Sequence, residues 1–175
     1  MTDTCLRHWH PLLSSRQLGR HPVAYQLAGR LLVLYRTEKG QVAALGRVCP
    51  HRRMSLAAGR VVGEALVCRY HGWRFDGDGA VQCPLMPSAA LRHQAYQARE
   101  AHGLVWVRQA GQNENPEDSP SLPSWSQDGL LPAGITLHRV AAPLELTLDN
   151  FTETEHTTSV HQVFGFRDPR EIELR

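Results

Sequence analysis

Two short segments of this chain each combine one cysteine with one histidine at close spacing. The first has the pattern Cys-x-His and spans Cys49 to His51, and the second has the pattern Cys-x-x-His and spans Cys68 to His71. Sixteen residues separate the two segments. Thiolate and imidazole are the side chains that bind borderline and soft transition metals. Four of them in two close pairs predict a fold built around a metal centre.

Three interpretations of these four residues are open. They could be ordinary core or surface residues, because free cysteine is among the most buried residue types. They could bind structural zinc, although zinc sites usually pair cysteine with cysteine and histidine with histidine along the chain. They could bind a [2Fe–2S] cluster of the Rieske type, in which two histidines replace two cysteines on one iron. The mixed pairs favour the cluster, because each segment then supplies one ligand to each iron.

In their wider context the two segments resemble the cluster loops of the Rieske non-haem iron oxygenases. The residues that carry the resemblance are Cys49-Pro50-His51-Arg52 and Cys68-Arg69-Tyr70-His71-Gly72-Trp73. The resemblance implies that Cys49 and Cys68 bind one iron, and that His51 and His71 bind the other. Arg69 stands where these loops often carry proline, but it is not at a ligand position. Neither loop has the extra cysteine of respiratory Rieske proteins, so we expect no disulfide between the loops. The loops also lack the hydroxyls that respiratory proteins direct at the cluster, which predicts a low reduction potential.

Composition bounds the remaining possibilities. The chain has 175 residues, 42% of them apolar and 21% charged, which is typical of a globular protein with one domain or slightly more. A net charge of +2 gives no argument for nucleic acid or a membrane surface as partner. No apolar run approaches the roughly 20 residues of a membrane span, and the start has no secretory pattern. Cys5 and Cys83 lie outside the motifs and are expected to be reduced thiols of a cytoplasmic protein.

Short apolar segments separated by turn residues surround the two cluster segments, as is typical of antiparallel strands. We expect strands at residues 22–27, 30–35, 41–45, 61–62, 65–67, 96–100 and 104–108, after an entry segment at 9–13. The apolar run from Leu31 to Leu34 predicts a strand covered on both faces. Residues 76–79 read Asp-Gly-Asp-Gly and predict a turn rather than a calcium loop, because an EF-hand needs a longer series of ligands. Residues 1–110 are therefore expected to form a mainly β Rieske domain, with antiparallel sheets that carry the two cluster loops.

The composition changes after this domain. Residues 111–134 are rich in Asn, Glu, Asp, Ser and Pro, and are predicted to be a linker. A strand is expected at residues 136–140. Residues 135–175 are expected to begin an α+β catalytic domain that is incomplete in this chain.

A second motif lies in this last segment. Taken alone, it is a polar helix whose N-terminus Asp149 or Asn150 would cap. The spacing of Asn150, Glu153, His156 and His161, however, resembles the mononuclear iron motif of the same oxygenase family. The resemblance implies that His156 and His161 bind a non-haem Fe(II), in a site type that uses two histidines and one carboxylate and leaves positions for O₂. Glu153 stands where the family usually has aspartate, and the resemblance implies a relay or supporting role for it.

Two features of this motif need explanation. Residues five apart on an ideal helix point about 140° away from each other, so a π-bulge or a break is expected between His156 and His161. The carboxylate ligand of the family comes from far downstream. Asp168 and Glu171 are near in sequence, but neither matches that position. We therefore expect the third ligand to be outside this chain.

Together the motifs predict the N-terminal portion of the oxygenase component of a Rieske oxygenase. Family members take electrons from a ferredoxin or a flavin-dependent reductase, activate O₂, and hydroxylate or oxidatively demethylate aromatic or related small organic substrates. They assemble as homotrimers, and no nucleic acid or membrane is involved. One alternative is a Rieske electron carrier without oxygenase activity, for which residues 1–110 would suffice. Another is a colourless binding module held together by zinc.

Overall fold

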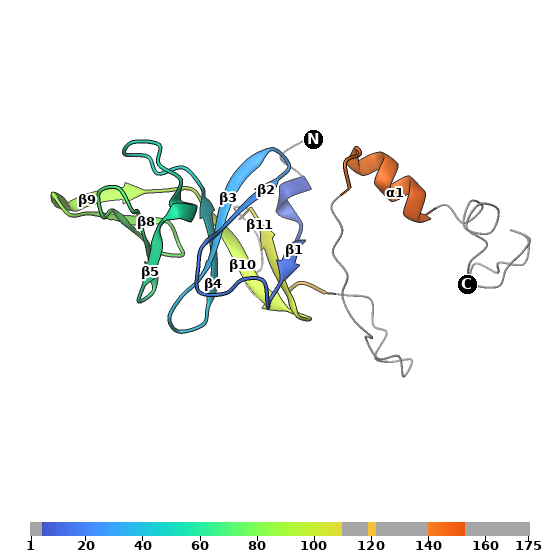
Figure 1. The fold of residues 1–175 in the computed structure, drawn as a ribbon, viewed down its shortest axis with the longest axis horizontal. Helices are drawn as coiled ribbons and strands as arrows, with labels where there is room; N and C mark the ends of the chain where they lie inside the picture. Colours follow the sequence, from blue (N-terminus) through green and yellow to red (C-terminus); the bar gives the residue numbers. More distant parts are fainter. Residues whose placement is uncertain (1–4, 110–118, 122–139, 153–175) are drawn as a thin grey trace, which may run out of the picture. The chain divides into compact units, whose positions relative to one another are not determined.

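The computed structural model describes residues 5–109, 119–121 and 140–152, and the chain divides into two compact units at residues 1–135 and 136–175 (Figure 1). The described residues form eleven strands, two short 3-10 helices and one α-helix. In chain order these elements are η1 (Cys5–Arg7), β1 (His10–Ser14), β2 (Val23–Leu27), β3 (Arg30–Arg36), β4 (Val42–Gly46), η2 (Leu56–Ala58), β5 (Arg60–Val62), β6 (Ala65–Val67), β7 (Arg74–Phe75), β8 (Ala80–Cys83), β9 (Met86–Arg92), β10 (Ala95–Ala101), β11 (Leu104–Arg108) and α1 (Leu144–Thr152).

The strands form two antiparallel sheets, which confirms the predicted mainly β fold class. The larger sheet has six strands in the order β1-β11-β10-β4-β3-β2. The smaller sheet has five strands, β5 to β9, each paired with the next one along the chain. Figure 1 shows this small sheet in green beside the larger one. The chain leaves the larger sheet after β4 and returns to it at β10, so both cluster segments lie in the part of the chain inserted between these two strands.

Strand β3 explains how the first unit is packed. Successive side chains of a strand point to opposite faces of its sheet. Val33 and Tyr35 accordingly pack in one core, together with buried side chains of the small sheet such as Phe75. Leu32 and Leu34 pack in a second core with side chains of β1, β10 and β11. The predicted burial on both faces is confirmed for residues 32–34 but is wrong for Leu31, which is 40% exposed.

The core between the two sheets also contains the two motif cysteines. Cys49 and Cys68 are buried there with Leu56 of η2 and Leu66 of β6. The first cluster segment leaves the end of β4, and the second connects β6 to β7. Tyr35 links the sheets, because its hydroxyl lies 3.5 Å from the carbonyl oxygen of Phe75, to which it donates a hydrogen bond. Burial raises the pKa of Tyr35, and the carboxylates of Asp76, Asp78 and Glu64 raise it further.

Most predicted strands before and after the small sheet are present within one or two residues of their expected ends. The predictions missed β1, which was expected to be an entry segment, and the strands β7, β8 and β9. The reason is local sequence: β7 has two residues, and prolines stand at position 84 before β9 and at position 87 within it. Residues 136–139 of the strand expected at 136–140 lie outside the described residues, as does nearly all of the predicted linker, and Val140 is described but is not in a strand.

The described part of the second unit contains the helix α1. It begins at Leu144, directly after Pro143, and the amide of Thr147 donates to the carbonyl of Pro143. Asp149 and Asn150 are therefore inside the helix, so the expectation that one of them caps its N-terminus is wrong. The apolar side chains of Leu146, Leu148 and Phe151 are exposed on this helix. No helix among the described residues is long and apolar enough to cross a membrane.

Candidate metal centre

The two cluster loops are closed by the same backbone pattern. In the first, the amide of Cys49 donates to the carbonyl of Met54 at 2.9 Å, and the amide of Arg53 donates to the carbonyl of Cys49 at 2.9 Å. In the second, Cys68 donates to the carbonyl of Trp73 at 2.8 Å, and Gly72 donates to the carbonyl of Cys68 at 3.1 Å. In both loops the residue four positions after the cysteine has a positive φ, 56° at Arg53 and 72° at Gly72. The loops are thus two versions of one turn, although their histidines stand at different distances from the cysteine.

This shared turn brings the two thiols together inside the protein. Cys49 is 2% exposed and Cys68 is 3% exposed. Their side chains are within hydrogen-bonding reach of each other, and both are free thiols, as is the buried Cys83.

The environment of Cys49 suits a sulfur that carries negative charge in a metal complex. Burial raises the pKa of the Cys49 thiol, because it disfavours the thiolate. The backbone N–H groups of His51 and Arg52 hydrogen-bond to this side chain and oppose that effect. A metal that replaces the proton would therefore find two N–H donors already directed at the sulfur, and such donors also tune the potential of an iron–sulfur site.

The two histidines form a separate pair at the surface. Their rings are exposed, and the ring centroids of His51 and His71 lie 4.5 Å apart. Trp73 stacks on His51 with 4.9 Å between centroids and 3° between planes. The ring of Tyr70 lies 3.9 Å from that of His71. The sequence motif includes both aromatic residues, but their contacts with the histidines could not be read from it.

Electrostatics favours the metal-binding form of one imidazole. The pKa of His71 is lowered by desolvation and by the nearby positive charges of His51 and Arg52. The neutral ring is the form that binds a metal ion.

The sulfur and nitrogen donor atoms occupy separate positions, as a Rieske two-iron cluster requires. Sulfur lies with sulfur in the core, and nitrogen lies with nitrogen at the surface. In a Rieske centre one iron takes the two thiolates and the other takes the two imidazoles. Among the described residues, no three His, Cys, Asp or Glu side chains form a group that could hold a single metal ion. A two-iron cluster needs no such group, since each iron takes two protein ligands. These four residues therefore fit the cluster.

The second predicted site is almost entirely outside the described residues. Asn150 lies on α1 and is exposed. Glu153, His156 and His161 are outside the described part of the chain, as are Asp168, Glu171 and the predicted break between the two histidines.

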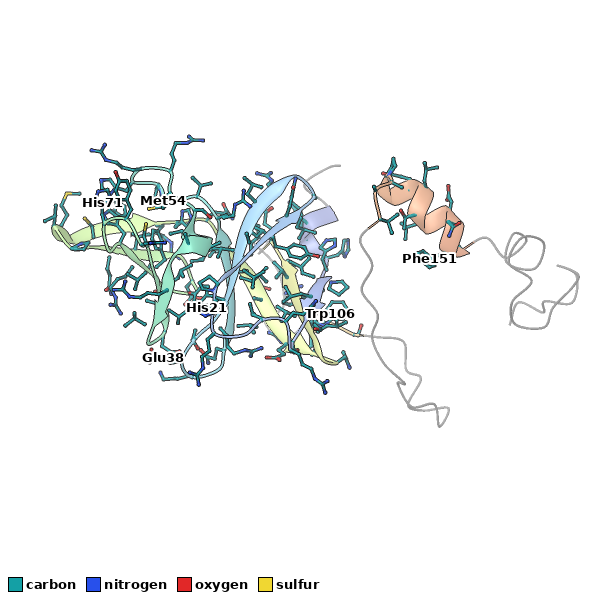
Figure 2. The ribbon with its side chains drawn as sticks, in the orientation of Figure 1. His21, Glu38, Met54, His71, Trp106 and Phe151 are labelled. Carbon is teal, nitrogen blue, oxygen red and sulfur yellow. The ribbon has the colours of Figure 1, made fainter. Side chains whose placement is uncertain are left out.

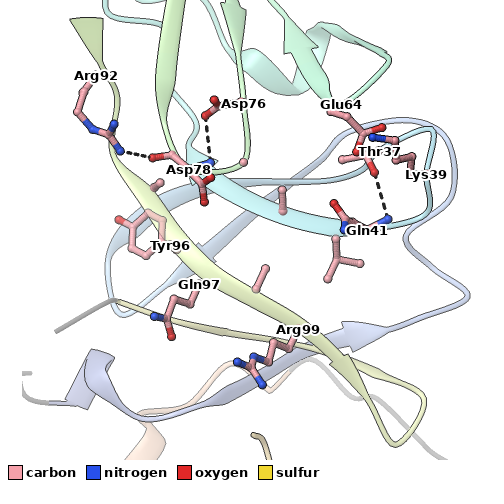
Figure 3. A pocket seen from close by; sticks show the side chains of 15 residues that line it. Thr37, Lys39, Gln41, Glu64, Asp76, Asp78, Arg92, Tyr96, Gln97 and Arg99 are labelled. Atoms are coloured by element: carbon pink, nitrogen blue, oxygen red, sulfur yellow. Dashed lines mark hydrogen bonds between the residues drawn. The ribbon is translucent and has the colours of Figure 1, made fainter. Parts of the chain in front are cut away.

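A cavity in the first unit lies away from the cluster loops. It has a volume of about 720 Å³ and is lined by residues of β4 and β10 and of the turn between β7 and β8, with Arg92 at its edge (Figure 3). The carboxylate of Asp76 accepts hydrogen bonds from the amides of Asp78 at 3.1 Å and Ala80 at 2.7 Å. The predicted turn at residues 76–79 is therefore confirmed, with Asp76 as the residue that organises it.

Comparison with known proteins identifies the family. Residues 8–97 match the Rieske [2Fe-2S] domain. The chain is 32% identical over 164 residues to the oxygenase subunit of phthalate 4,5-dioxygenase from Pseudomonas putida, which covers 89% of this chain and 37% of that protein. It is 34% identical over 137 residues to the oxygenase subunit of 5,5'-dehydrodivanillate O-demethylase from a Sphingobium species, covering 71% of this chain and 31% of the relative.

A solved structure extends this similarity beyond the Rieske domain. The structure of an NdmA mutant from Pseudomonas putida CBB5 with theobromine superimposes with a TM-score of 0.74 at 25% identity, covering 97% of this chain and 54% of the other. The chain belongs to the Rieske [2Fe–2S] domain family. It spans 37% and 31% of the lengths of the two curated relatives.

Proposed function

We propose that Cys49, His51, Cys68 and His71 bind a Rieske [2Fe–2S] cluster, and that the chain is the N-terminal portion of a Rieske oxygenase's oxygenase component. One observation carries the first part: the two thiols are paired in the core and the two imidazoles are paired at the surface. The names of the relatives support the second part, because both curated relatives described above are oxygenase subunits.

The residues around the site have different proposed roles. The cluster supplies a one-electron redox couple, and the mononuclear Fe(II) of the full-length protein supplies O₂ activation. Cys49 and Cys68 fix the cluster to the core between the sheets. His51 and His71 present its other side at the surface, where electrons can enter or leave. Trp73 holds the ring plane of His51 by stacking on it.

The same proposal assigns the second motif. His156 and His161 are two ligands of the mononuclear iron, and Glu153 orients His156 or relays electrons or protons to it. The carboxylate that completes the site is not assigned to this chain. The spacing of the motif and its position after a Rieske domain support this assignment.

The proposed reaction is hydroxylation or oxidative demethylation of an aromatic or related small organic substrate with O₂. A ferredoxin or a flavin-dependent reductase provides the electrons, and the full-length protein is a homotrimer in the cytoplasm. Relatives named for a dioxygenase acting on phthalate and for an O-demethylase support both reaction types.

The experiment compares the full-length protein with its His156→Ala variant, and His138→Ala serves as a control for loss of a histidine in the same unit. The assay supplies a reductase, NADH and O₂ with a panel of aromatic acids that carry methoxy, chloro or second carboxyl groups. We expect His156→Ala to lose product and about one iron per chain while it keeps the cluster absorption. The rival function, an electron carrier, predicts no product from any protein and the same iron content in all three.

A further inference from the structure

The two cluster loops start from different sheets. The first loop leaves the end of β4, in the larger sheet, and the second connects β6 to β7, in the small sheet. Each loop carries one motif cysteine and one motif histidine. Figure 2 shows Met54 of the first loop and His71 of the second at the same end of the small sheet. A cluster held by both loops therefore depends on how the small sheet is fixed to β4.

The two connections between the sheets are bonded to each other. The outward connection begins after Gly46, the last residue of β4, and the return connection is His93-Gln94, between β9 and β10. The amide of Gly46 donates to the carbonyl of Gln94 at 2.8 Å. The amide of His93 donates to the carbonyl of Gly79 at 2.7 Å, in the turn between β7 and β8. Three segments of the chain therefore meet at this junction.

The side chain of His93 crosses the junction. Its Nε2 atom lies 2.8 Å from the carbonyl oxygen of Gly46. A carbonyl oxygen only accepts, so Nε2 carries a proton and donates it in this bond. The same ring meets Phe75 of β7 edge to face, with 5.2 Å between the ring centroids and 63° between the planes. Phe75 is fully buried in the core that contains both motif cysteines. His93 therefore contacts the strand that leads into the first loop and the strand that follows the second.

The segments around His93 are closely packed. A Cβ added to Gly46 would lie 3.3 Å from Nε2 of His93, which is tighter than ordinary van der Waals contact. A Cβ added to Gly79 would lie 2.4 Å from the carbonyl oxygen of His93, which is closer than real Cβ atoms approach. Glycine at both positions lets the segments approach each other, and the small sheet has little room to shift against β4.

The first cluster loop begins next to this junction. Gly46 precedes Cys49 by three residues. The backbone N–H groups of His51 and Arg52 hydrogen-bond to the side chain of Cys49. Such bonds stabilise the more negative, reduced form of an iron–sulfur cluster and so raise its potential. A displacement of Gly46 would be transmitted through the backbone to these bonds.

We propose that His93 is a positioning residue for the cluster: its hydrogen bond to Gly46 and its contact with Phe75 fix the first cluster loop relative to the second. This rests on the proposed function, because it requires the cluster. Loss of the bond to Gly46 lets the first loop move away from the second, and the N–H bonds to the sulfur of Cys49 weaken. The reduction potential of the cluster then falls.

The test uses the full 175-residue chain with its cluster and two substitutions of His93. His93→Leu removes the donor and keeps much of the apolar volume, whereas His93→Gln keeps an N–H at a similar reach. Titration with dithionite and redox mediators measures the potential, as the oxidised cluster takes up one electron. In His93→Leu we expect the equilibrium constant for reduction to fall about tenfold, or about 59 mV, as weakened hydrogen bonds to a charged sulfur imply. His93→Gln should restore most of the difference.

Two further variants separate positioning from a simple loss of stability. His21→Leu removes an exposed histidine before β2 (Figure 2) and should leave the potential unchanged. Gly46→Ala perturbs the same contact from β4, because its methyl group must displace the ring of His93 by a few tenths of an ångström. It should lower the potential, and the double variant Gly46→Ala/His93→Leu should lie no lower than His93→Leu alone. If His93→Leu does not retain its cluster, Gly46→Ala decides the question.

The proposed function and the positioning role fail in different ways. A wild-type chain without iron and acid-labile sulfide would refute the proposed function. Loaded proteins with the same potential in the wild type, His93→Leu and Gly46→Ala would refute the positioning role alone, whatever their melting temperatures. An equal shift in His93→Gln and His93→Leu would also overturn it, because the hydrogen bond would then not be the cause.

Discussion

Substitution of Gly59 by alanine tests how closely the two cluster loops depend on each other. Gly59 follows η2 with extended backbone angles, φ −79° and ψ −167°, which alanine adopts without strain. A Cβ at this position would lie 2.4 Å from the carbonyl oxygen of Val67 and 2.9 Å from that of Leu56. Both are backbone atoms and cannot rotate away. Val67 immediately precedes Cys68, so the methyl group must push the second loop away from the first.

The expected cost follows from this overlap. Extra methyl groups in a closely packed region cost about 1–3 kcal/mol. For domains of this size each kcal/mol lowers the melting temperature by about 4–8 °C, so Gly59→Ala should melt roughly 5–20 °C lower. Separation of the thiols should also reduce the iron content. Differential scanning calorimetry and iron analysis of the anaerobic protein measure both effects.

Gly19→Ala is the matched control. Gly19 is exposed, and a Cβ there would meet no atom within 4 Å. Its substitution should change stability by less than about 0.5 kcal/mol, as is usual for surface positions. If Gly59→Ala were as stable and as rich in iron as Gly19→Ala, the close approach of η2 to β6 would not hold the loops together.

Three further predictions follow from individual contacts. Cys68→Ser should abolish the cluster absorption, whereas Cys83→Ser, which removes a buried thiol outside the loops, should keep it. Loss of the absorption in both variants would contradict the ligand assignment. The hydrogen bonds from Arg36 lower the pKa of Glu100, so this carboxylate stabilises the fold above its unfolded pKa of about 4.3 and loses that effect as the pH falls through its folded pKa. Glu100→Gln should therefore cost at most about 1 kcal/mol at pH 7, because the pair is partly exposed. The difference in melting temperature should narrow only as the pH falls below about 4, the unfolded pKa of a glutamate, and a constant difference would refute the reasoning. Trp73→Leu should change the nitrogen couplings in pulsed EPR of the reduced cluster. Trp73→Phe should change these couplings little, since phenylalanine keeps the stacking on the imidazole of His51. Equal effects of the two substitutions would contradict the role of stacking.

The sequence predicts the type of site because the chemistry of its candidate ligands is local. Two mixed Cys/His pairs limit the ligands to one class of cluster, and the apolar segments around them limit the scaffold to short strands. The common closure of the two loops could not be predicted, because the histidine follows its cysteine by two residues in one loop and by three in the other. It depends on the backbone bonds of Cys49 and Cys68 and on a positive φ, which Gly72 signals and Arg53 does not.

The errors in the fold also have physical reasons. Strand β7 has only two residues and β9 directly follows a turn with Pro84, so the pairing of these strands comes from the sheet and not from their own propensity. Leu31 belongs to an apolar run but stands next to the turn between β2 and β3, where only part of the strand is covered. The start of α1 was misplaced because Asp149 and Asn150 have capping side chains, whereas the helix begins one and a half turns earlier at Pro143–Leu144.

The most direct test of the account is the metal content and spectrum of the 175-residue chain, purified without oxygen. The account predicts about two irons and two acid-labile sulfides per chain, reduction by dithionite, and pulsed-EPR couplings from two nitrogen ligands in the reduced state. It also predicts no third tightly bound iron, because only two ligands of the mononuclear site are assigned to this chain. A colourless chain with one zinc, or an iron–sulfur signal without nitrogen couplings, would contradict it.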